Sequence, residues 1–336
     1  MRTLDLTIGV TSFNDAHVLG LLLASIEQTV QGRAFELLAI DNCSTDESAT
    51  LLRKAGATVW LVQCRQAEAL NELLARARGE YLLLLHSEVV LLSPQWFDLC
   101  RRHAQGPCVL VSPEDVGLGP GVRGRYGRGM PESSFLFFRR DRAQQMRSLC
   151  RTARRTARTL WKFGRLREFD FRGAHVTHNI PALLSDHKYS WQSMEVLTSP
   201  RMAESWYAFR NGEGAWDEEW AHYVYGFGNF YRLDGVVTHY HQWYARATAG
   251  DTERMGPRTA PVEFLRQSQE RFARDYERGQ VLLPDPAAVP LGKGALSLSA
   301  YAGLVGAAGS SQGPRHPTIC VGDMERDMRG EATSEL

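Results

Sequence analysis

The chain has 336 residues, 43% of them hydrophobic, and a formal net charge of +1 at neutral pH. This is enough apolar sequence to bury the core of one large α/β domain, or of one domain with an appended lobe. A charge so close to zero provides no global attraction to nucleic acid, so we expect no nucleic-acid partner.

The N-terminal segment MRTLDLTIGV lacks the apolar run and cleavage site of a signal peptide, and no stretch reaches 18 uninterrupted apolar residues. The six cysteines form no C-x-x-C pair and no regular framework, which favours a reduced protein. We therefore expect a cytoplasmic protein without a transmembrane segment. Lysine occurs only at positions 54, 162, 188 and 293, and this preference for arginine hints at a GC-rich bacterial source.

Apolar runs of strand length alternate with segments of helical period along the first 115 residues. We expect strands at residues 6–12, 35–40, 58–62, 81–85 and 108–111, and helices at residues 15–29, 44–54, 67–78 and 94–103. The second helix should open on a capping box formed by Ser44 and Glu47. Repeated β–α units imply right-handed crossovers and a mostly parallel, doubly wound sheet.

The pattern changes after residue 115. Residues 116–131 are rich in Gly and Arg, which is the composition of a loop. Residues 139–167 hold eleven Arg or Lys and one acid. They could form a basic helix that lies over phosphate or over an anionic surface; the other interpretation is the solvated face of a helix. Residues 284–336 turn to Ala, Gly, Ser and Pro and predict a partly disordered tail. We therefore divide the chain into halves at 1–115 and 116–283, followed by this tail.

Four consecutive leucines, residues 82–85, predict a strand that is buried on both faces and runs into His86, Ser87 and Glu88. Ligands of α/β sheets bind beyond the carboxyl ends of such strands. Strand alternation should place His86 and Glu88 on one face and Ser87 on the other. This arrangement suits a metal–diphosphate site, where a buried Glu88 would need a partner.

The ends of the first two strands carry polar residues but no phosphate-binding glycine motif. Neither is followed by G-x-G-x-x-G, and G-x-x-x-x-G-K-[ST] is absent, which argues against a dinucleotide dehydrogenase and against P-loop phosphoryl transfer. Asp41, at the end of the second strand, could hydrogen-bond a nucleobase or ribose, or could be a turn or cap residue.

The segments TIGVTSFN, ELLAIDNCSTDES, QAEALNELLARARGEYLLLLHSE and VVLLSPQWF resemble family 2 glycosyltransferases of the GT-A fold, in order and spacing, over roughly residues 4–115. The resemblance implies a GT-A-like α/β fold with helices flanking the sheet and an aromatic-rich acceptor-side region. It also implies an inverting, hexosyltransferase-like enzyme that moves a sugar from a nucleotide-diphosphate sugar to an acceptor hydroxyl. The positions it assigns to the nucleotide sugar are Thr11, Asn14, Asp41, Gln66 and Asn71.

The D-x-D step of that family falls on His86-Ser87-Glu88, so this chain departs from the family at the first acid. By resemblance, His86 stands where the family contacts the donor ribose, and Glu88 keeps the acid that touches a divalent metal, Mg²⁺ or Mn²⁺. His239 matches the family's downstream histidine that can return to the metal, and His241 shares its face. The other interpretation of His239 is a structural hydrogen-bonding residue.

Inverting transfer needs a carboxylate that deprotonates the acceptor hydroxyl. The segment Trp216-Asp217-Glu218-Glu219-Trp220 is the one acid cluster flanked by aromatics, and it resembles the family's acceptor-side segment. We therefore predict Asp217, then Glu218, as the general base; acids favoured at a helix N-terminus are the other interpretation. The nearby aromatic residues would stack on sugar rings or belong to the core.

Two other functions remain open. A sugar-phosphate nucleotidyltransferase would need a Gly-rich, basic loop after the first strand, and TSFNDAHVLGLLL has neither feature. A non-catalytic nucleotide-sugar-binding module of the same fold is suggested by His86. The sequence names neither donor sugar, base nor acceptor; a natural-product or polysaccharide pathway would fit, and the basic segment leaves peripheral membrane contact open.

Overall fold

The computed structural model describes residues 4–114, 131–146, 150, 176–177, 179–197, 225, 228–242, 262–283 and 296–297. The Gly- and Arg-rich loop (except residue 131), most of the basic segment and the tail (except residues 296–297) lie outside these residues. Every statement below concerns the described part of the chain, in which no helix combines the length and the apolar character needed to cross a membrane.

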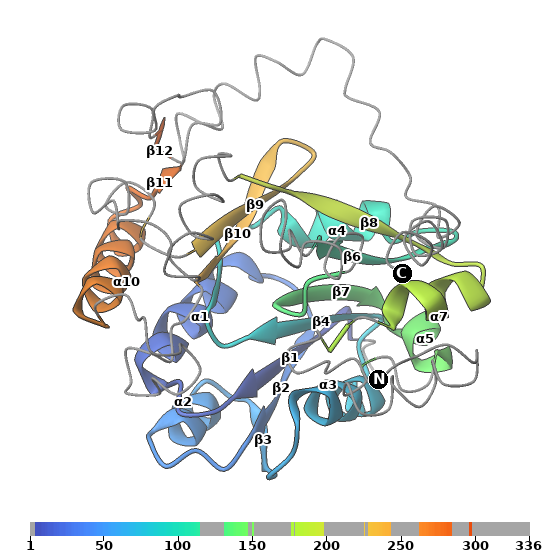
Figure 1. Ribbon diagram of the computed structural model, residues 1–336, viewed down its shortest axis with the longest axis horizontal. Coiled ribbons are helices and arrows are strands. Elements are labelled where there is room, and N and C mark those ends of the chain that lie inside the picture. The colour runs from blue at the N-terminus through green and yellow to red at the C-terminus, as the bar shows by residue number, and fades with distance from the viewer. Residues whose placement is uncertain are drawn as a thin grey trace, which may run out of the picture.

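The first half of the chain builds a parallel sheet with a helix after each strand (Figure 1). Its elements in order are β1 (Leu6–Ser12), α1 (Ala16–Thr29), β2 (Phe35–Asp41), α2 (Ser48–Lys54), β3 (Thr58–Leu61), α3 (Gln66–Arg76) and β4 (Tyr81–His86). β1 pairs in parallel with β2 and β4, and β2 pairs in parallel with β3. The predicted doubly wound α/β architecture is confirmed.

The remaining elements extend this sheet, mainly through antiparallel pairs. They are β5 (Val89–Leu91), α4 (Trp96–His103), β6 (Cys108–Pro113), β7 (Phe135–Arg139), α5 (Arg140–Gln145), α7 (Ile180–Asp186), β8 (Ser190–Val196), β9 (Gly228–Leu233), β10 (Val236–Gln242) and α10 (Val262–Glu277). The ten strands follow the order β3-β2-β1-β4-β7-β6-β8-β9-β10-β5. β11 (Leu282–Leu283) and β12 (Leu296–Ser297) form a separate pair.

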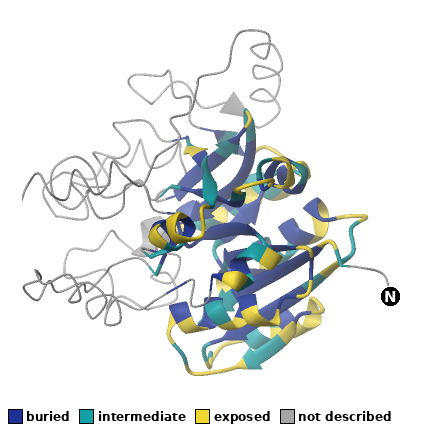
Figure 2. Cartoon of the chain, turned by 90° about the vertical axis from the view of Figure 1, so that its right-hand side faces the viewer, coloured by how far each residue is buried: buried dark blue, intermediate teal, exposed yellow. Residues whose placement is uncertain are grey.

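Helices cover both faces of the sheet, and the leucines of β4 divide between them. Leu83 and Leu85 pack with residues of α1, α2 and α4, whereas Leu82 and Leu84 pack with residues of α3, α5 and α7. All four leucines are fully buried, and burial of each contributes about 1.5–3 kcal/mol. Figure 2 shows the central strands of the sheet mainly in the colour of buried residues. The prediction of a strand covered on both faces is confirmed.

The connection from β4 to β5 shapes the whole sheet. Only Ser87 and Glu88 separate these two strands, yet β5 lies at the far end of the strand order, beside β10. A two-residue link spans on the order of 10 Å. The far end of the sheet therefore returns to the carboxyl end of β4, and the two predicted halves of the chain share one sheet.

The helix α10 covers this returning end. Phe272 stacks on Tyr240 of β10, with ring centroids 4.3 Å apart, and packs in one apolar cluster with Val90 of β5. The Tyr225 hydroxyl donates a hydrogen bond of 2.8 Å to Asp275 of the same helix. These contacts hold β5 and β10 in place behind the site described next.

The predicted capping box at the start of α2 is wrong. The Ser44 hydroxyl donates to the Asp41 carboxylate (2.6 Å), and the helix begins later, at Ser48, with no side-chain cap at Glu47. Asp46 accepts from the backbone amides of Ser48 and Ala16, 3.0 Å each. The buried Asp41 carboxylate binds the Ser44 hydroxyl, so the serine stabilises the turn after β2 and does not cap the helix.

Candidate active site

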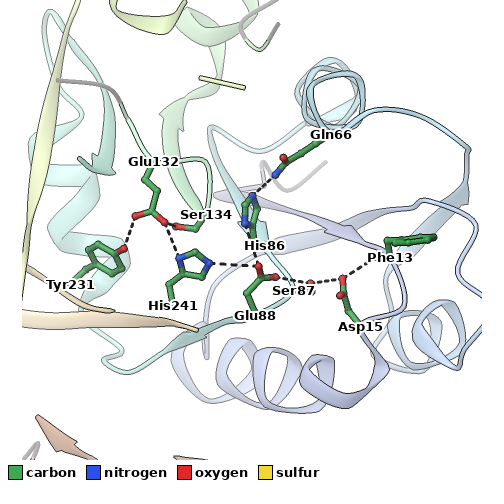
Figure 3. A network of polar contacts seen from close by, with 10 residues as sticks. All are labelled: Phe13, Asp15, Gln66, His86, Ser87, Glu88, Glu132, Ser134, Tyr231 and His241. Carbon is green, nitrogen blue, oxygen red and sulfur yellow. Dashed lines mark hydrogen bonds and ion pairs between the residues drawn. The ribbon is translucent and has the colours of Figure 1, made fainter. Parts of the chain in front are cut away.

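Three side chains converge where β4 passes into β5 (Figure 3). His86, Glu88 and His241 each offer one ligand atom, and these atoms all lie within 4.8 Å of one another. Glu88 Oε1 lies 3.7 Å from His86 Nδ1 and 3.6 Å from His241 Nε2. The predicted placement of His86 and Glu88 on one face agrees with this geometry.

The pairing of β10 with β5 explains why His241 reaches the cluster. His241 stands opposite Val89, the residue after Glu88, and the Gln242 amide donates to the Glu88 carbonyl oxygen (3.2 Å). His239 stands opposite Leu91, one side-chain repeat farther from Glu88. The register therefore brings His241, and not His239, beside Glu88.

His239 occupies an aromatic stack instead of the metal position expected for it. Its ring lies between Phe135 and Tyr231, with centroids 4.3 and 4.6 Å away, and Nδ1 lies 2.9 Å from the Thr238 hydroxyl. Burial, with a smaller contribution from His241, lowers the pKa of His239 to about 3. It is a neutral core residue at neutral pH, which corresponds to the alternative interpretation made from the sequence.

The charges at the cluster are strongly coupled. Burial alone would raise the pKa of Glu88, but its contacts with His241 and His86 outweigh this and place the pKa well below its ordinary value. Burial alone would lower the pKa of His241, yet the carboxylates of Glu132 and Glu88 raise it to about 9. Without a metal, His241 is therefore a cation between two carboxylates at neutral pH.

Glu132 is a residue of the candidate site that sequence reasoning missed. It precedes β7 and is 2% exposed, and its Oε1 lies 2.8 Å from His241 Nδ1. Burial would raise the pKa of Glu132, but His241, Tyr231 and Ser134 lower it to about 2. The only local signal was an acid directly before an apolar strand, in PESSFLFF.

Gln66 contacts the ring of His86 and orients it. The Gln66 amide nitrogen lies 2.5 Å from His86 Nε2, at the start of α3. This contact occupies one ring nitrogen of His86, and the other, Nδ1, faces Glu88.

Ser87 connects the cluster to Asp15 and fixes the turn between β4 and β5. Its hydroxyl lies 2.5 Å from Asp15 Oδ2 and 3.0 Å from Glu88 Oε2. Asp15 also accepts a 2.9 Å hydrogen bond from the Phe13 amide. The loop after β1 is thereby tied to the residue beside Glu88.

The loops after β1 and β2 are joined to each other. Asn14 has a positive φ of 54°, and its side-chain oxygen accepts from the Thr45 amide (2.8 Å). The backbone amide of Asn14 donates to the Ser44 hydroxyl (2.9 Å). Thr11 lies on β1 in register with His86 on β4. These residues form the edge of the sheet next to the cluster.

Asp41 and Asn71 make structural contacts. Asp41 is fully buried and accepts from both the amide and the hydroxyl of Ser44, 2.7 and 2.6 Å. It lies at the same sheet edge as Glu88, on the strand beyond β1. The Asn71 side chain donates to the Cys150 carbonyl (2.7 Å) and accepts from the Cys150 amide (3.0 Å). Asn71 is not brought to the cluster.

The cluster fits a divalent metal ion. One carboxylate and two imidazoles are a known ligand set for divalent transition-metal ions, and the donor atoms lie within 4.8 Å of one another. The predicted general bases Asp217 and Glu218, and most of the aromatic-rich segment around them, lie outside the described residues.

Comparison with known proteins finds a family model that matches the first part of the chain. Residues 7–161 match the model described as glycosyl transferase family 2. None of the curated proteins matches the chain.

Solved structures with a similar arrangement are distant in sequence. TarS of S. aureus, residues 1–349, is 17% identical, with 45% of this chain and 52% of that chain covered and a TM-score of 0.33. Glucosyl-3-phosphoglycerate synthase from Mycobacterium tuberculosis, with Mn²⁺, UDP and glucosyl-3-phosphoglycerate, is 19% identical, with 41% and 57% covered and a TM-score of 0.33. Mannosyltransferase PcManGT from Pyrobaculum calidifontis, with GDP-Man and Mn²⁺, is 13% identical, with 99% and 80% covered and a TM-score of 0.42.

The chain spans about half the length of the TarS fragment and of the synthase. The family assignment therefore rests on the family model, which covers β1 to α5 and includes His86, Glu88 and Glu132. The finding is therefore a match of residues 7–161, somewhat less than half of the chain, to the model of glycosyl transferase family 2.

Proposed function

We propose that this protein is a glycosyltransferase that moves a sugar, in the first instance a hexose, from a nucleotide-diphosphate sugar to an acceptor hydroxyl with inversion. The observation that carries the proposal is the convergence of His86, Glu88 and His241 at the carboxyl edge of a family 2 sheet. Nucleotide ligands of α/β sheets bind at this edge.

In this proposal Glu88, His86 and His241 hold a divalent metal, Mn²⁺ or Mg²⁺. Bound there, the metal would neutralise the charge that develops on the leaving diphosphate. Gln66 keeps the His86 ring oriented through its 2.5 Å contact. The imidazolium of His241 would lose one of its two ring N–H protons when the ion binds, because a ring nitrogen that binds a metal carries no proton.

The loops that hold Thr11, Asn14 and Asp41 would form the nucleotide side of the site. Their mutual hydrogen bonds give a preformed edge next to the cluster. Both Asp41 oxygens accept hydrogen bonds from Ser44. We therefore propose that the main role of Asp41 is to hold the shape of this loop, and that direct contact with the base is secondary. Preformed geometry of this kind reduces the entropy lost on binding.

The acceptor side of the proposal depends on Asp217 or Glu218 as general base. An inverting transfer needs one carboxylate within hydrogen-bond reach of the attacking hydroxyl. Glu132 is unsuited to this task because it is buried and its oxygens are engaged by Tyr231, Ser134 and His241.

Substitution of Glu88 tests the proposed function. We expect Glu88→Gln to lower the release of nucleoside diphosphate from a panel of nucleotide sugars by about 100-fold or more, since a metal supplies several kcal/mol at the transition state. The assay is run with Mn²⁺, with Mg²⁺ and with a chelator, and circular dichroism checks the fold. Wild-type rates in a folded Glu88→Gln protein would overturn the metal assignment.

A non-catalytic nucleotide-sugar-binding module is the second candidate, and His86 in place of the family's first acid is the observation that favours it. Calorimetry on the same panel separates the two functions. Binding of a nucleotide sugar without turnover, with any acceptor hydroxyl tried, supports the module. Hydrolysis or transfer supports the enzyme.

A further inference from the structure

A buried carboxylate stands behind His241, on the side opposite Glu88 (Figure 3). Glu132 Oε1 lies 2.8 Å from His241 Nδ1, and His241 Nε2 lies 3.6 Å from Glu88. The imidazole therefore bridges a carboxylate inside the protein and the carboxylate of the metal cluster.

Two hydroxyl groups hold Glu132 in this orientation. The Tyr231 hydroxyl donates to Oε2 (2.5 Å), and the Ser134 hydroxyl donates to Oε1 (2.8 Å). Tyr231 and Ser134 are fully buried. An ionised carboxylate buried without such partners would cost several kcal/mol. The partners come from β9 and from the segment before β7, so this arrangement exists only in the assembled sheet.

We propose that Glu132 is a positioning residue that selects the metal-binding nitrogen of His241. This inference rests on the proposed function, because it assigns a role toward the metal of that site. Nδ1–H of His241 donates to Glu132, and Nε2 is left to the ion. Carboxylate–histidine–metal arrangements fix the tautomer and the ring orientation and make the imidazole a stronger ligand.

The contact with Glu132 bears directly on the tilt of the His241 ring. A histidine on a strand end can rotate about χ2, since that torsion is broad, and His86 meets it only at an edge, with ring centroids 5.8 Å apart. The 2.8 Å ion-pair contact with Glu132 places Nδ1 toward that carboxylate and Nε2 toward Glu88.

The test measures the affinity of Mn²⁺ alone, from the electron paramagnetic resonance signal of the free ion. We expect Glu132→Gln to weaken Mn²⁺ binding about 10- to 100-fold, the usual effect of removing such an outer carboxylate. Tyr231→Phe, which removes one hydrogen bond and keeps the charge, should weaken it less. Glu36→Gln is the matched control: Glu36 is a largely buried, hydrogen-bonded glutamate at the opposite end of the sheet, and its loss should leave Mn²⁺ affinity unchanged.

A spectroscopic readout identifies the nitrogen directly. In ¹⁵N-histidine-labelled protein with Zn²⁺ as a diamagnetic probe, we expect His241 Nε2 to carry the shift of a metal-bound nitrogen and Nδ1 to keep its proton. In Tyr231→Phe, which leaves the carboxylate in place, the same pattern should persist. Zn²⁺ on Nδ1 in the wild type would overturn the proposal, even if Glu132→Gln fails to fold.

The outcomes separate this inference from the proposed function. Equal Mn²⁺ affinity of the wild type and a folded Glu132→Gln overturns the positioning role and leaves the transferase proposal standing. Glu132-dependent Mn²⁺ binding without any turnover of nucleotide sugars supports the positioning role and overturns the transferase. Failure of the wild type to bind either ion overturns the metal site and, with it, the role of Glu132.

Discussion

Two histidines on one strand have opposite roles in this protein. His239 is neutral and stacked in the core, whereas His241 is paired with Glu132 and faces Glu88. They lie on the same face of β10, two residues apart along the strand. Only their positions along the β5 pairing, opposite Leu91 and opposite Val89, distinguish them.

Substitution of each histidine separates these roles. We expect His239→Phe to leave Mn²⁺ affinity unchanged and the free energy of unfolding within about 1 kcal/mol of wild type, because a second aromatic ring keeps the stack on Phe135 and Tyr231. The buried Nε2 of His239, which has no hydrogen-bond partner among the described residues, loses nothing in the exchange.

His241→Gln, which can still donate to Glu132, should lower Mn²⁺ affinity at least 10-fold. Urea unfolding and Mn²⁺ titration of both variants provide the measurements. The assignment of His241 would be wrong if His239→Phe lost the metal and His241→Gln retained it.

The sequence predicted Glu88 and Gln66 at the site but not Glu132 or the choice between the histidines. Glu88 and Gln66 belong to β–α units whose parallel pairing follows from local period, so the strand ends could be aligned in advance. His241 and Glu132 reach Glu88 through antiparallel pairing between segments more than 40 residues apart. Nothing in the local pattern encodes that register.

At the scale of elements, Glu36 joins the start of β2 to the turn before β4. Its carboxylate accepts from the Thr7 hydroxyl (2.7 Å) and from Arg78, including the backbone amide (2.8 Å) and Nε (2.8 Å). The Gly79 amide donates to Thr7 Oγ1 (2.8 Å). A Cβ at Gly79 would lie 2.4 Å from the Leu6 carbonyl carbon, so this turn packs directly on β1.

This network predicts a pH dependence of stability. Burial would raise the pKa of Glu36, but hydrogen bonds from Arg78 and Thr7 outweigh it and lower the pKa. The unfolded chain therefore binds a proton more readily, so the stabilisation is present above the ordinary pKa of about 4.5 and is lost as the pH falls below it.

We expect Glu36→Gln to lower the free energy of unfolding by about 1–3 kcal/mol at pH 7, the usual worth of hydrogen bonds to a charged group. The difference from wild type should shrink between pH 5 and pH 3. Urea unfolding at several pH values measures it, and a difference that stays constant with pH would contradict the assignment.

At the scale of the whole molecule, the sheet closes back on itself through the short link between β4 and β5. The alternation of strands and helices up to residue 115 was predictable because each unit carries its own apolar period and turn residues. The insertion of β7 beside β4 and the return of β5 to β10 were not, since both depend on segments far along the chain. The functional cluster forms at this point of return.

The same topology predicts that residues 1–115 do not fold alone. Without β7, β4 loses the cover of Phe135, Leu136, Phe137 and Phe138, which are fully buried, and β5 loses its partner β10. Burial of four such side chains is worth on the order of 10 kcal/mol, which is comparable with the whole stability of a typical domain.

We therefore expect a chain ending at residue 115 to show no cooperative urea transition by circular dichroism. A chain ending at residue 283, which keeps all ten strands of the sheet and α10, should unfold in one transition close to that of the full-length protein. A cooperative, native-like transition in the shorter chain would mean that the N-terminal strands are stable without their antiparallel neighbours. Glu88 would then be positioned before β10 arrives, and the return of the sheet would only add His241 to a site that already exists.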